Sequence, residues 1–450
     1  MDFSILPIEQ LLNPEGFECT CGKRHKTALK YLEIGQGAIN SLSDVLKKCG
    51  VKKPFVVCDK NTYVVAGERV LALLNGAGID YASYIFPQDK IEPEEYTVGQ
   101  VTMSFDPSCD FIIAVGTGVI NDICKIVAKT SGREYLIVGT APSMDGFASN
   151  SSSMVWNGIK STIYTVCPVA IIADIEIMCN APMLMIQAGL GDMIAKFVSI
   201  CEWRMSNIIT NEYFCPQIAQ LMRNAVKKCV ASTTKLCERD PQSVLSVTEG
   251  LILSGIAMSF AEISRPASGL EHYFSHIFDM YSLEKGTDGS LHGIQVGIGT
   301  VLTLSIYDKL RVLEPNRETA LAYVEAFDYN KWEHEMHRMF GKTAANLIDL
   351  EKQCGKNDKE KHTQRLEVIL INWERLQAVM SEELPSADDM IALLNGVGAP
   401  VKPIEIGIQN DEVYDALMAS KEIRDKYIAS RLLWDLGLLD QYAKDLVETL

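Results

Sequence analysis

The sequence has too few basic residues for a protein that binds polyanions over a broad surface. Lys and Arg number 42 against 58 Asp and Glu, which gives a formal net charge of −16. No run of Lys or Arg is interleaved with aromatic residues, as it is in nucleic-acid grooves. We therefore expect no nucleic-acid partner.

We expect neither a signal peptide nor a membrane anchor. The chain opens with MDFSILPIEQLLN, in which Asp2 stands where a signal peptide carries positive charge. No apolar run approaches the roughly 20 residues that span a bilayer. We expect a cytoplasmic protein without stable membrane insertion.

The cysteine pattern argues against a disulfide framework. The 13 cysteines are an odd number, and those at Cys58, Cys124, Cys167 and Cys201 stand singly in apolar segments. Such cysteines are typical of reduced cytosolic proteins.

One cluster near the N-terminus is different, because Cys19, Cys21 and His25 lie together in CTCGKRH. A Cys-x-Cys pair with one His lacks a fourth zinc ligand and the usual two-residue spacer. We interpret this segment as a turn between short strands.

The sequence does contain enough apolar residues for two domains, with 450 residues of which 47% are hydrophobic. Up to about residue 180, short β-branched runs alternate with amphipathic segments, which is typical of a parallel sheet flanked by helices. Beyond Pro182 the pattern changes to long segments with helical periodicity. We predict an α/β N-terminal domain (1–180) with a parallel sheet, followed by an all-α C-terminal domain (181–450).

The individual elements are predicted from the same periodicities. Strands are expected at Pro54–Cys58, Ala82–Phe86, Phe111–Val115, Tyr135–Val138 and Val169–Ala173. Helices are expected at 61–75, 94–103, 117–130, 184–205, 211–238, 243–264, 289–307, 317–350 and 361–381. The charged segment 351–362 indicates a solvated loop between helices.

Histidine is scarce, and its distribution suggests a metal site. Three of only seven histidines, His272, His276 and His292, crowd into one segment. The carboxylate of Asp192 with the imidazoles of His272 and His292 suits a divalent ion such as zinc, nickel or iron. Three protein ligands leave a position open for Lewis-acid chemistry. Alternatively, His272 and His276 share one helix face while His292 packs elsewhere.

A glycine turn follows a buried strand in FIIAVGTGVINDICKIVA. Gly116, Thr117 and Gly118 lie where the strand ends and a helix begins, and amides at a helix N-terminus attract phosphate. The third glycine of the dinucleotide fingerprint is missing, so a plain strand-to-helix turn is the alternative. Asp122 and Lys125, one turn into the helix, can reach substrate or cofactor or be surface charge.

A second strand exit, LIVGTAPSMDGFASNSSSM, is rich in polar residues: Thr140, Ser143, Asp145, Ser149 and Ser151. Hydroxyl groups at this position can donate to phosphate or ribose oxygens. The alternative is an ordinary turn and loop stabilised by serine side chains.

Asp59 directly follows the strand PFVVC. An acid at this position can accept a hydrogen bond from a ribose 2′-hydroxyl and disfavours a 2′-phosphate, so it favours NAD over NADP, although Lys60 adjoins it. The alternative role of Asp59 is a helix N-cap.

Several longer motifs together resemble a known family, the sn-glycerol-1-phosphate dehydrogenases of the iron-containing alcohol dehydrogenase, glycerol dehydrogenase and dehydroquinate synthase superfamily. The motifs are GTGVINDICK (116–125), TAPSMDGFAS (140–149), GLGDMIAKF (189–197), SRPASGLEHYFSH (264–276), HGIQVG (292–297) and GVGAPVKPIEIGI (396–408). The N-terminal extension with CTCG resembles the bacterial branch.

The resemblance implies a dehydrogenase with a Rossmann-like N-terminal domain and an all-helical C-terminal domain. It would use NAD(H) or NADP(H) and one divalent metal ion, in a homodimer. By motif position, the dinucleotide would contact Gly116, Thr117, Gly118, Val119, Ile120, Thr140, Ser143 and Ser149, with Asp59 near its adenosine ribose. Asp145, Asp192 and His276 would contact substrate as catalytic residues, and Asp192, His272 and His292 would bind the metal.

The implied reaction reduces dihydroxyacetone phosphate to sn-glycerol 1-phosphate by hydride transfer, with the metal polarising the C2 oxygen. His276 would pass a proton to that oxygen or, alternatively, orient a ligand. Arg265, Ser268 and Asn150 are compatible with a site for the substrate phosphate.

Three other functions compete with this one. A glycerol or small-polyol dehydrogenase would share cofactor and metal but lack a phosphate site. A cyclase of the dehydroquinate synthase type has Glu as its oxygen ligand, so Asp192 counts against it. A nucleotide-binding sensor with a decayed site conflicts with the intact motifs.

Overall fold

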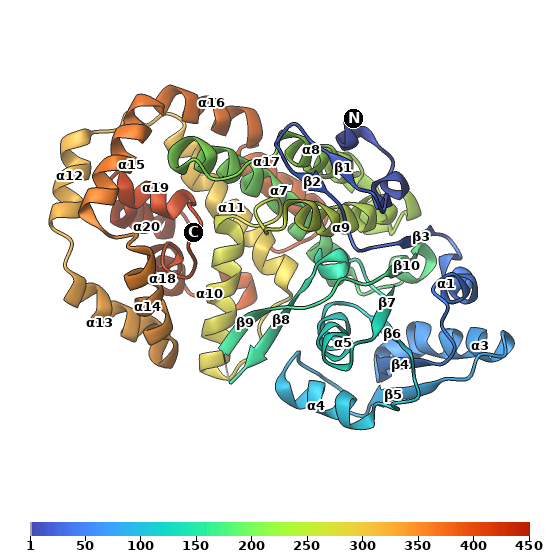
Figure 1. Cartoon of the computed structure of the whole chain (residues 1–450). Helices are drawn as coiled ribbons and strands as arrows, with labels where there is room; N and C mark the ends of the chain where they lie inside the picture. Colours follow the sequence, from blue (N-terminus) through green and yellow to red (C-terminus); the bar gives the residue numbers. More distant parts are fainter. Residues whose placement is uncertain (1, 158) are drawn as a thin grey trace. The chain divides into compact units, whose positions relative to one another are not determined.

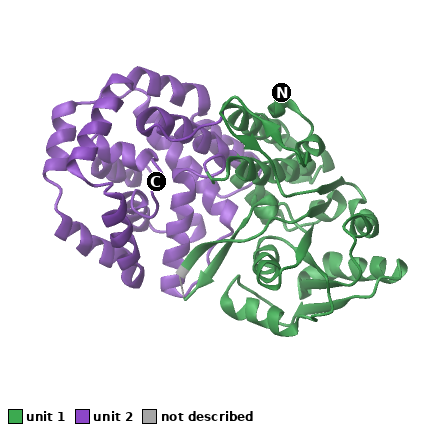
Figure 2. Ribbon diagram, viewed as in Figure 1, with its two compact units in different colours: residues 1–193, 216–264 green, residues 194–215, 265–450 purple. Residues whose placement is uncertain are grey.

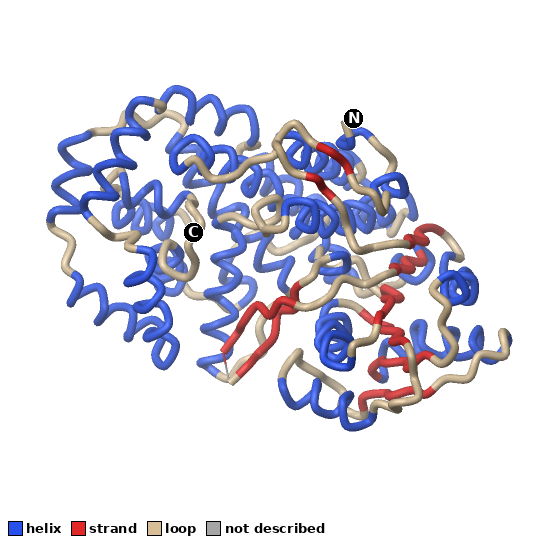
Figure 3. Tube along the Cα trace, viewed as in Figure 1, coloured by secondary structure: helices blue, strands red, loops and turns tan. Residues whose placement is uncertain are grey.

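The chain folds into two compact units, and the computed structural model describes residues 2–157 and 159–450. Figure 2 shows unit 1 (Met1–Met193 and Pro216–Ser264) and unit 2 (Ile194–Cys215 and Arg265–Leu450) in different colours. The described strands all precede Ile175, and helices dominate after it, as Figure 3 shows. The predicted order of an α/β region followed by a helical region is therefore confirmed. Unit 1 nevertheless continues past residue 180 into helices.

A six-stranded parallel sheet forms the centre of unit 1, in the order β3-β10-β7-β6-β4-β5. Its strands are β3 (Tyr31–Gly35), β4 (Pro54–Asp59), β5 (Ala82–Phe86), β6 (Phe111–Gly116), β7 (Glu134–Gly139) and β10 (Ala170–Asp174). The five predicted strands are all present. The edge strand β3 was not predicted, because its residues are only half-buried and its sequence YLEIG carries no strong apolar run.

Helices cover both faces of this sheet (Figure 1). They are α1 (Leu42–Lys48), α3 (Glu68–Gly76), α4 (Glu95–Ser104) and α5 (Gly118–Ser131). On one face, Val45 of α1 and Val70 of α3 share an apolar core with Val56 of β4. On the other face, the Tyr135 hydroxyl donates to Asn121 Oδ1 of α5 at 3.1 Å. Burial of these apolar surfaces is what stabilises the doubly covered sheet.

The remaining elements of unit 1 surround this core. Before β4 lie η1 (Phe3–Ile5), η2 (Ile8–Leu12), β1 (Phe17–Glu18), β2 (Arg24–His25) and η3 (Ala38–Ser41). After β4 come α2 (Lys60–Thr62), η4 (Tyr63–Gly67), η5 (Gly146–Ala148), β8 (Ser151–Trp156), β9 (Ile159–Tyr164), α6 (Ile175–Cys179), α8 (Pro216–Ala231), η6 (Thr233–Glu238) and α9 (Pro241–Ala261). The antiparallel pair β1–β2 confirms the predicted turn between short strands. The hairpin β8–β9 was not predicted.

A single long helix, α7 (Met183–Thr210), begins in unit 1 and ends in unit 2. Both α7 and α9 are long and apolar enough by composition to cross a membrane, which corrects the expectation that no apolar run approaches that length. Within the fold, 83% of the apolar window of α7 and 72% of that of α9 are buried. Their apolar composition is therefore explained by their position as core helices.

Helices make up the described part of unit 2. After α7 they are α10 (Leu270–Lys285), α11 (His292–Leu310), α12 (Arg317–Glu325), α13 (Tyr329–Phe340), η7 (Gly341–Thr343), α14 (Ala344–Cys354), α15 (Lys359–Ile371), α16 (Trp373–Glu383), α17 (Ala387–Gly396), η8 (Pro403–Ile406), α18 (Asn410–Ser420), α19 (Ala429–Asp435) and α20 (Leu439–Glu448).

The single helix predicted at 317–350 is wrong, because the segment forms α12, α13 and α14. The Asp328 side chain caps a new helix by accepting from the backbone N–H of Asn330 at 2.8 Å. Gly341, at φ +47°, then ends α13. The helix predicted at 361–381 is likewise divided, between α15 and α16.

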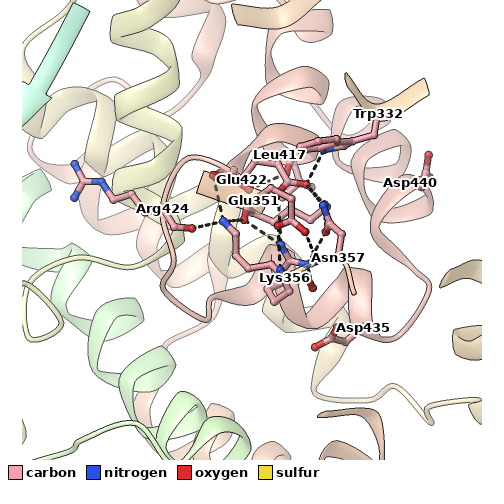
Figure 4. Close-up of polar contacts among 12 residues, drawn as sticks. Trp332, Glu351, Lys356, Asn357, Leu417, Glu422, Arg424, Asp435 and Asp440 are labelled. Carbon is pink, nitrogen blue, oxygen red and sulfur yellow. Dashed lines mark hydrogen bonds and ion pairs between the residues drawn. The ribbon is translucent and has the colours of Figure 1, made fainter. Parts of the chain in front are cut away.

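The charged segment 351–362 contains the predicted loop between helices, because α14 ends in it, α15 begins in it, and Lys352 and residues 358–361 are exposed. Not all of its polar residues are solvated. Glu351 and Asn357 are buried, at 2% and 0% exposure. The Asn357 backbone N–H donates to Glu351 Oε1 at 2.7 Å, and its side-chain amide donates to Glu422 Oε1 at 3.2 Å. Figure 4 shows this network, in which Lys356 Nζ also donates to the Arg424 carbonyl at 2.6 Å. The loop between α14 and α15 is therefore hydrogen-bonded to the chain between α18 and α19.

Candidate active site

The carboxyl ends of β4 and β6 form the natural ligand-binding edge of unit 1. From β4 the chain moves outward to β5, whereas from β6 it moves the other way to β7 and β10. Open α/β sheets bind ligands at the point where this direction reverses. Asp59 ends β4 and Gly116 ends β6, so two of the predicted cofactor segments flank that point.

The glycine turn and the polar segment after β7 meet at this edge. Thr117 is the N-cap of α5, and its hydroxyl lies 3.0 Å from that of Ser143. The Thr140 backbone N–H donates to the Gly116 carbonyl at 3.1 Å. A Cβ on Gly116 would lie 2.7 Å from Ile120 Cβ, so the turn into α5 requires glycine. The structure thus brings the two sequence motifs together beside a helix N-terminus, where phosphate binds favourably.

Lys125 is buried and holds the surrounding loop, so it is not a surface charge, which was one of the alternatives for this residue. Its buried Nζ donates to the Gly146 carbonyl at 2.7 Å, to Ser149 Oγ at 2.9 Å and to the Ser151 carbonyl at 2.8 Å. Burial lowers the pKa of Lys125, while Asp122, at 3.6 Å, opposes that effect. Lys125 therefore fixes the loop that carries Ser149, one of the predicted cofactor contacts.

Asp59 performs the capping role that the sequence left as an alternative. Its Oδ1 accepts from the Thr62 backbone N–H at 2.7 Å, and the Thr62 hydroxyl accepts from the Asp59 N–H at 3.0 Å. Lys60 pairs with Asp89 at 2.8 Å. The contact of Asp59 with a ribose remains a prediction.

Asp145 and Asp192 are linked within unit 1. Asp192, fully buried on α7, accepts a 2.9 Å hydrogen bond from the Asp145 N–H, and Asp145 Oδ2 accepts from the Ser254 hydroxyl at 2.7 Å. One turn earlier on α7, a Cβ at Gly189 would lie 1.8 Å from the Pro142 carbonyl oxygen. The first glycine of the GLGD motif, Gly189, therefore lets the helix approach the loop that carries Asp145.

Two of the predicted metal ligands lie together in unit 2. His272 is in the first turn of α10, and His292 is the first residue of α11. Their ring centroids are 5.3 Å apart, and a ligand atom of each lies within 4.8 Å of one on the other. His276 lies one turn along α10, with its ring 6.4 Å from that of His292. His292 therefore does not pack away from the other two histidines.

Buried partners orient both imidazoles. His272 Nδ1 lies 2.8 Å from Glu271 Oε1. The Ser275 hydroxyl donates to Gln295 Oε1 at 2.8 Å, so its oxygen can accept from His292 Nδ1, 3.1 Å away. Both contacts assign the proton to Nδ1 and leave Nε2 as the ligand nitrogen, as in many metal-bound histidines. The donor set of this unit therefore fits a divalent cation.

A second buried carboxyl group, that of Glu202 on α7, lies close to Glu271. Glu202 Oε1 accepts from the Tyr307 hydroxyl at 3.1 Å and from the Ala429 N–H at 2.8 Å, and Oε2 accepts from the Leu270 N–H at 2.9 Å. Burial and the nearby carboxylate of Glu271 raise the pKa of Glu202 to about 8. Glu202 is therefore mainly protonated at neutral pH. Spacing in the sequence gave no signal for this pair.

Comparison with known proteins identifies the family. Residues 33–182 match the family described as iron-containing alcohol dehydrogenase. The chain is 30% identical over 413 residues to the glycerol-1-phosphate dehydrogenase [NAD(P)+] of Halalkalibacterium halodurans, covering 91% of this chain and 93% of that protein. The chain belongs to the glycerol-1-phosphate dehydrogenase family. The family resemblance of its motifs, including the bacterial branch, is thereby confirmed.

A second relative carries the same name, and a solved structure shares the fold. The enzyme of the same name from Bacillus subtilis is 32% identical over 297 residues, which cover 65% of this chain and 75% of the relative. The solved structure of maleylacetate reductase from Agrobacterium tumefaciens matches with a TM-score of 0.62 at 12% identity, covering 94% of this chain and 96% of that one. The second match shows a shared fold alone.

The three residues suggested for a substrate phosphate differ in their surroundings. Arg265 is buried, with Nε donating to Glu212 Oε1 at 2.7 Å and an Nη donating to the Tyr427 carbonyl at 2.9 Å. These contacts make Arg265 a structural residue of unit 2 and argue against a phosphate contact. Ser268 is buried, and its hydroxyl has no hydrogen-bond partner among the described residues. Asn150 is exposed.

Proposed function

We propose that this protein reduces dihydroxyacetone phosphate to sn-glycerol 1-phosphate with NADH or NADPH. Family membership supports the proposal. The match covers 93% of the length of a relative that is named glycerol-1-phosphate dehydrogenase [NAD(P)+]. The observation that carries it is the imidazole pair of His272 and His292, which buried partners hold with Nε2 as the ligand nitrogen. Such a pair suits a catalytic metal better than a packing role.

We propose that Asp192 joins His272 and His292 as the ligands of one divalent ion. Asp192 is buried, lies in the GLGD motif and has one carboxylate oxygen oriented by a backbone N–H. One carboxylate with two imidazoles suits zinc, nickel or iron. When bound, the ion supplies positive charge that stabilises the negative charge developing on the C2 oxygen of the substrate.

The dinucleotide would bind across the carboxyl ends of β4 and β6. The N-terminus of α5 favours the pyrophosphate, and the hydroxyls of Thr117 and Ser143 can donate to its oxygens. Lys125 keeps Ser149 in place beside them. The nicotinamide supplies the hydride, and the protein supplies its orientation.

His276 and Asp145 are proposed to act on the substrate itself. His276 lies one helical turn from His272 and is only half-buried, so it can hand a proton to the C2 oxygen while remaining outside the proposed ligand set. The Ser254 hydroxyl holds the carboxylate of Asp145 in one position, from which it can accept a hydrogen bond from a substrate hydroxyl.

Steady-state turnover tests the proposal. Oxidation of NADH and of NADPH is followed with dihydroxyacetone phosphate and with dihydroxyacetone, and the glycerol phosphate formed is analysed on a chiral column. We expect turnover with dihydroxyacetone phosphate, sn-glycerol 1-phosphate as product, and loss of activity in chelator that one added metal restores. Faster turnover of unphosphorylated dihydroxyacetone would favour the small-polyol alternative.

We also propose that the protein is a cytoplasmic homodimer. This proposal comes from the family resemblance, and light scattering on the purified chain together with cell fractionation tests it. A monomeric mass or a membrane-bound fraction would contradict it.

A further inference from the structure

The N-terminal hairpin of unit 1 gathers three potential metal ligands. Its turn is closed by the Cys19 N–H donating to the Lys23 carbonyl at 3.1 Å and by the Gly22 N–H donating to the Cys19 carbonyl at 3.0 Å. Cys21 Sγ lies 3.2 Å from His25 Nε2. The ligand atoms of Cys19, Cys21 and His25 lie within 4.8 Å of one another, a spacing at which one small cation can touch all three.

His25 is oriented as metal-binding histidines are. It is fully buried, and its Nδ1 donates to the Phe260 carbonyl of α9 at 2.8 Å. That hydrogen bond fixes the proton on Nδ1 and presents Nε2 to the thiol of Cys21. The rings of Phe3 and Phe260 pack against the imidazole, with centroids 5.4 Å and 5.9 Å away. The imidazole of His25 is therefore oriented so that its Nε2 lone pair can bind a metal ion.

A fourth candidate ligand, which the hairpin sequence lacks, comes from a residue distant in sequence. Cys215 is a buried cysteine whose peptide bond joins it to Pro216, where α8 begins and the chain re-enters unit 1. It belongs to the same group of candidate ligands as the hairpin residues. Within unit 1, α8 is tied to the N-terminal segment, because the Asn224 side-chain amide donates to the Ser4 carbonyl at 3.0 Å.

We propose that Cys19, Cys21, His25 and Cys215 bind one structural zinc ion. Three thiolates and one imidazole form a soft, tetrahedral donor set that is typical of zinc. Four protein ligands leave no open position, so this ion would be structural and would have no part in the reaction. It would tie the β1–β2 hairpin to the start of α8, in addition to the contact of His25 with α9.

X-ray absorption at the zinc edge of the full-length protein, purified without chelator, is the direct test. We expect about one zinc per chain with sulfur scatterers at about 2.3 Å. The proposed catalytic set of Asp192, His272 and His292 contains no sulfur, so the sulfur signal reports this site alone. It should persist in Asp192→Asn, which makes failure of this inference distinguishable from failure of the proposed function. Zinc without sulfur ligands, or no zinc, would overturn the proposal.

Variants provide a second readout by elemental analysis and thermal unfolding. Cys21→Ser and Cys215→Ser should each lose about one zinc per chain and unfold at a lower temperature. Cys237→Ser, which removes an exposed thiol in η6, is the matched control and should keep its zinc. Retention of sulfur-bound zinc in Cys21→Ser and in Cys215→Ser would refute the ligand assignment.

Discussion

Asp192 Oδ2 accepts a hydrogen bond from the backbone N–H of Asp145 at 2.9 Å. The bond joins the first half of α7 to the loop after β7, and both lie in unit 1. This same loop carries Ser143 and Ser149, which were predicted to contact the cofactor. One backbone contact therefore connects the proposed metal-binding carboxylate with the proposed dinucleotide site.

Asp192→Asn tests the metal role of this carboxylate without breaking the contact. The amide oxygen of Asn can still accept from the Asp145 N–H, so we expect the fold to persist. The negative charge proposed to bind the cation is lost, and kcat/KM should fall at least about 100-fold together with the bound metal. Activity assays and elemental analysis measure both. Full activity in this variant would contradict the proposal that Asp192 is a metal ligand.

Gly189→Ala tests the close approach of α7 to the loop. The added methyl group would lie 1.8 Å from the Pro142 carbonyl oxygen, which is backbone and cannot swing away. We expect a loss of at least about 2 kcal/mol in the free energy of unfolding. Gly99→Ala on α4 is the control, because its methyl group meets no atom within 4 Å and helix propensity should add up to about 1 kcal/mol of stability. Chemical denaturation measures the free energy of unfolding of both variants, and equal changes would contradict the close approach of Gly189 to the Pro142 carbonyl.

Lys125→Met should loosen the loop between Gly146 and Ser151. The variant keeps most of the side-chain volume but removes the ammonium group that donates to Ser149 Oγ and to the carbonyls of Gly146 and Ser151. We expect the free energy of unfolding to fall by about 3 kcal/mol and the KM for the dinucleotide to rise. Lys129→Met, on the exposed side of the same helix, should change neither quantity measurably. Thermal unfolding and cofactor titrations provide the two readouts.

The sequence predicted the sheet well because its central strands are fully buried. Phe111–Gly116 is buried at every residue and therefore appears as a continuous apolar run, the pattern of a parallel strand. The half-buried strand Tyr31–Gly35 carries no such pattern. Breaks within 317–350 were missed because Asp328 and Gly341 stand alone inside a long amphipathic pattern.

The candidate site was predictable only in part. The scarcity of histidine singled out His272 and His292, whereas Glu271, Ser275 and Gln295 acquire their orienting roles through tertiary contacts. Cys215 likewise completes the proposed zinc set, although it lies 190 positions after His25 in the sequence. A local sequence pattern therefore cannot predict it as a ligand. Charge in 351–362 correctly indicated exposure at Lys352 and Lys361, but not the burial of Glu351 and Asn357, which depends on tertiary contacts such as that of Asn357 with Glu422.

The pH dependence of stability provides a test of the carboxyl pair in unit 2. Burial and Glu271 raise the pKa of Glu202 from 4.5 to about 8, so between these values the folded state holds a proton that the unfolded state has released. The free energy of unfolding should therefore fall as pH rises from about 5 to about 8, by up to about 1.4 kcal/mol per pH unit from this group. Glu202→Gln cannot titrate and should show a shallower slope in denaturant unfolding across this range. Glu448→Gln, an exposed control, should keep the wild-type slope. Identical slopes in the wild type and Glu202→Gln would show that Glu202 is ionised in the folded protein.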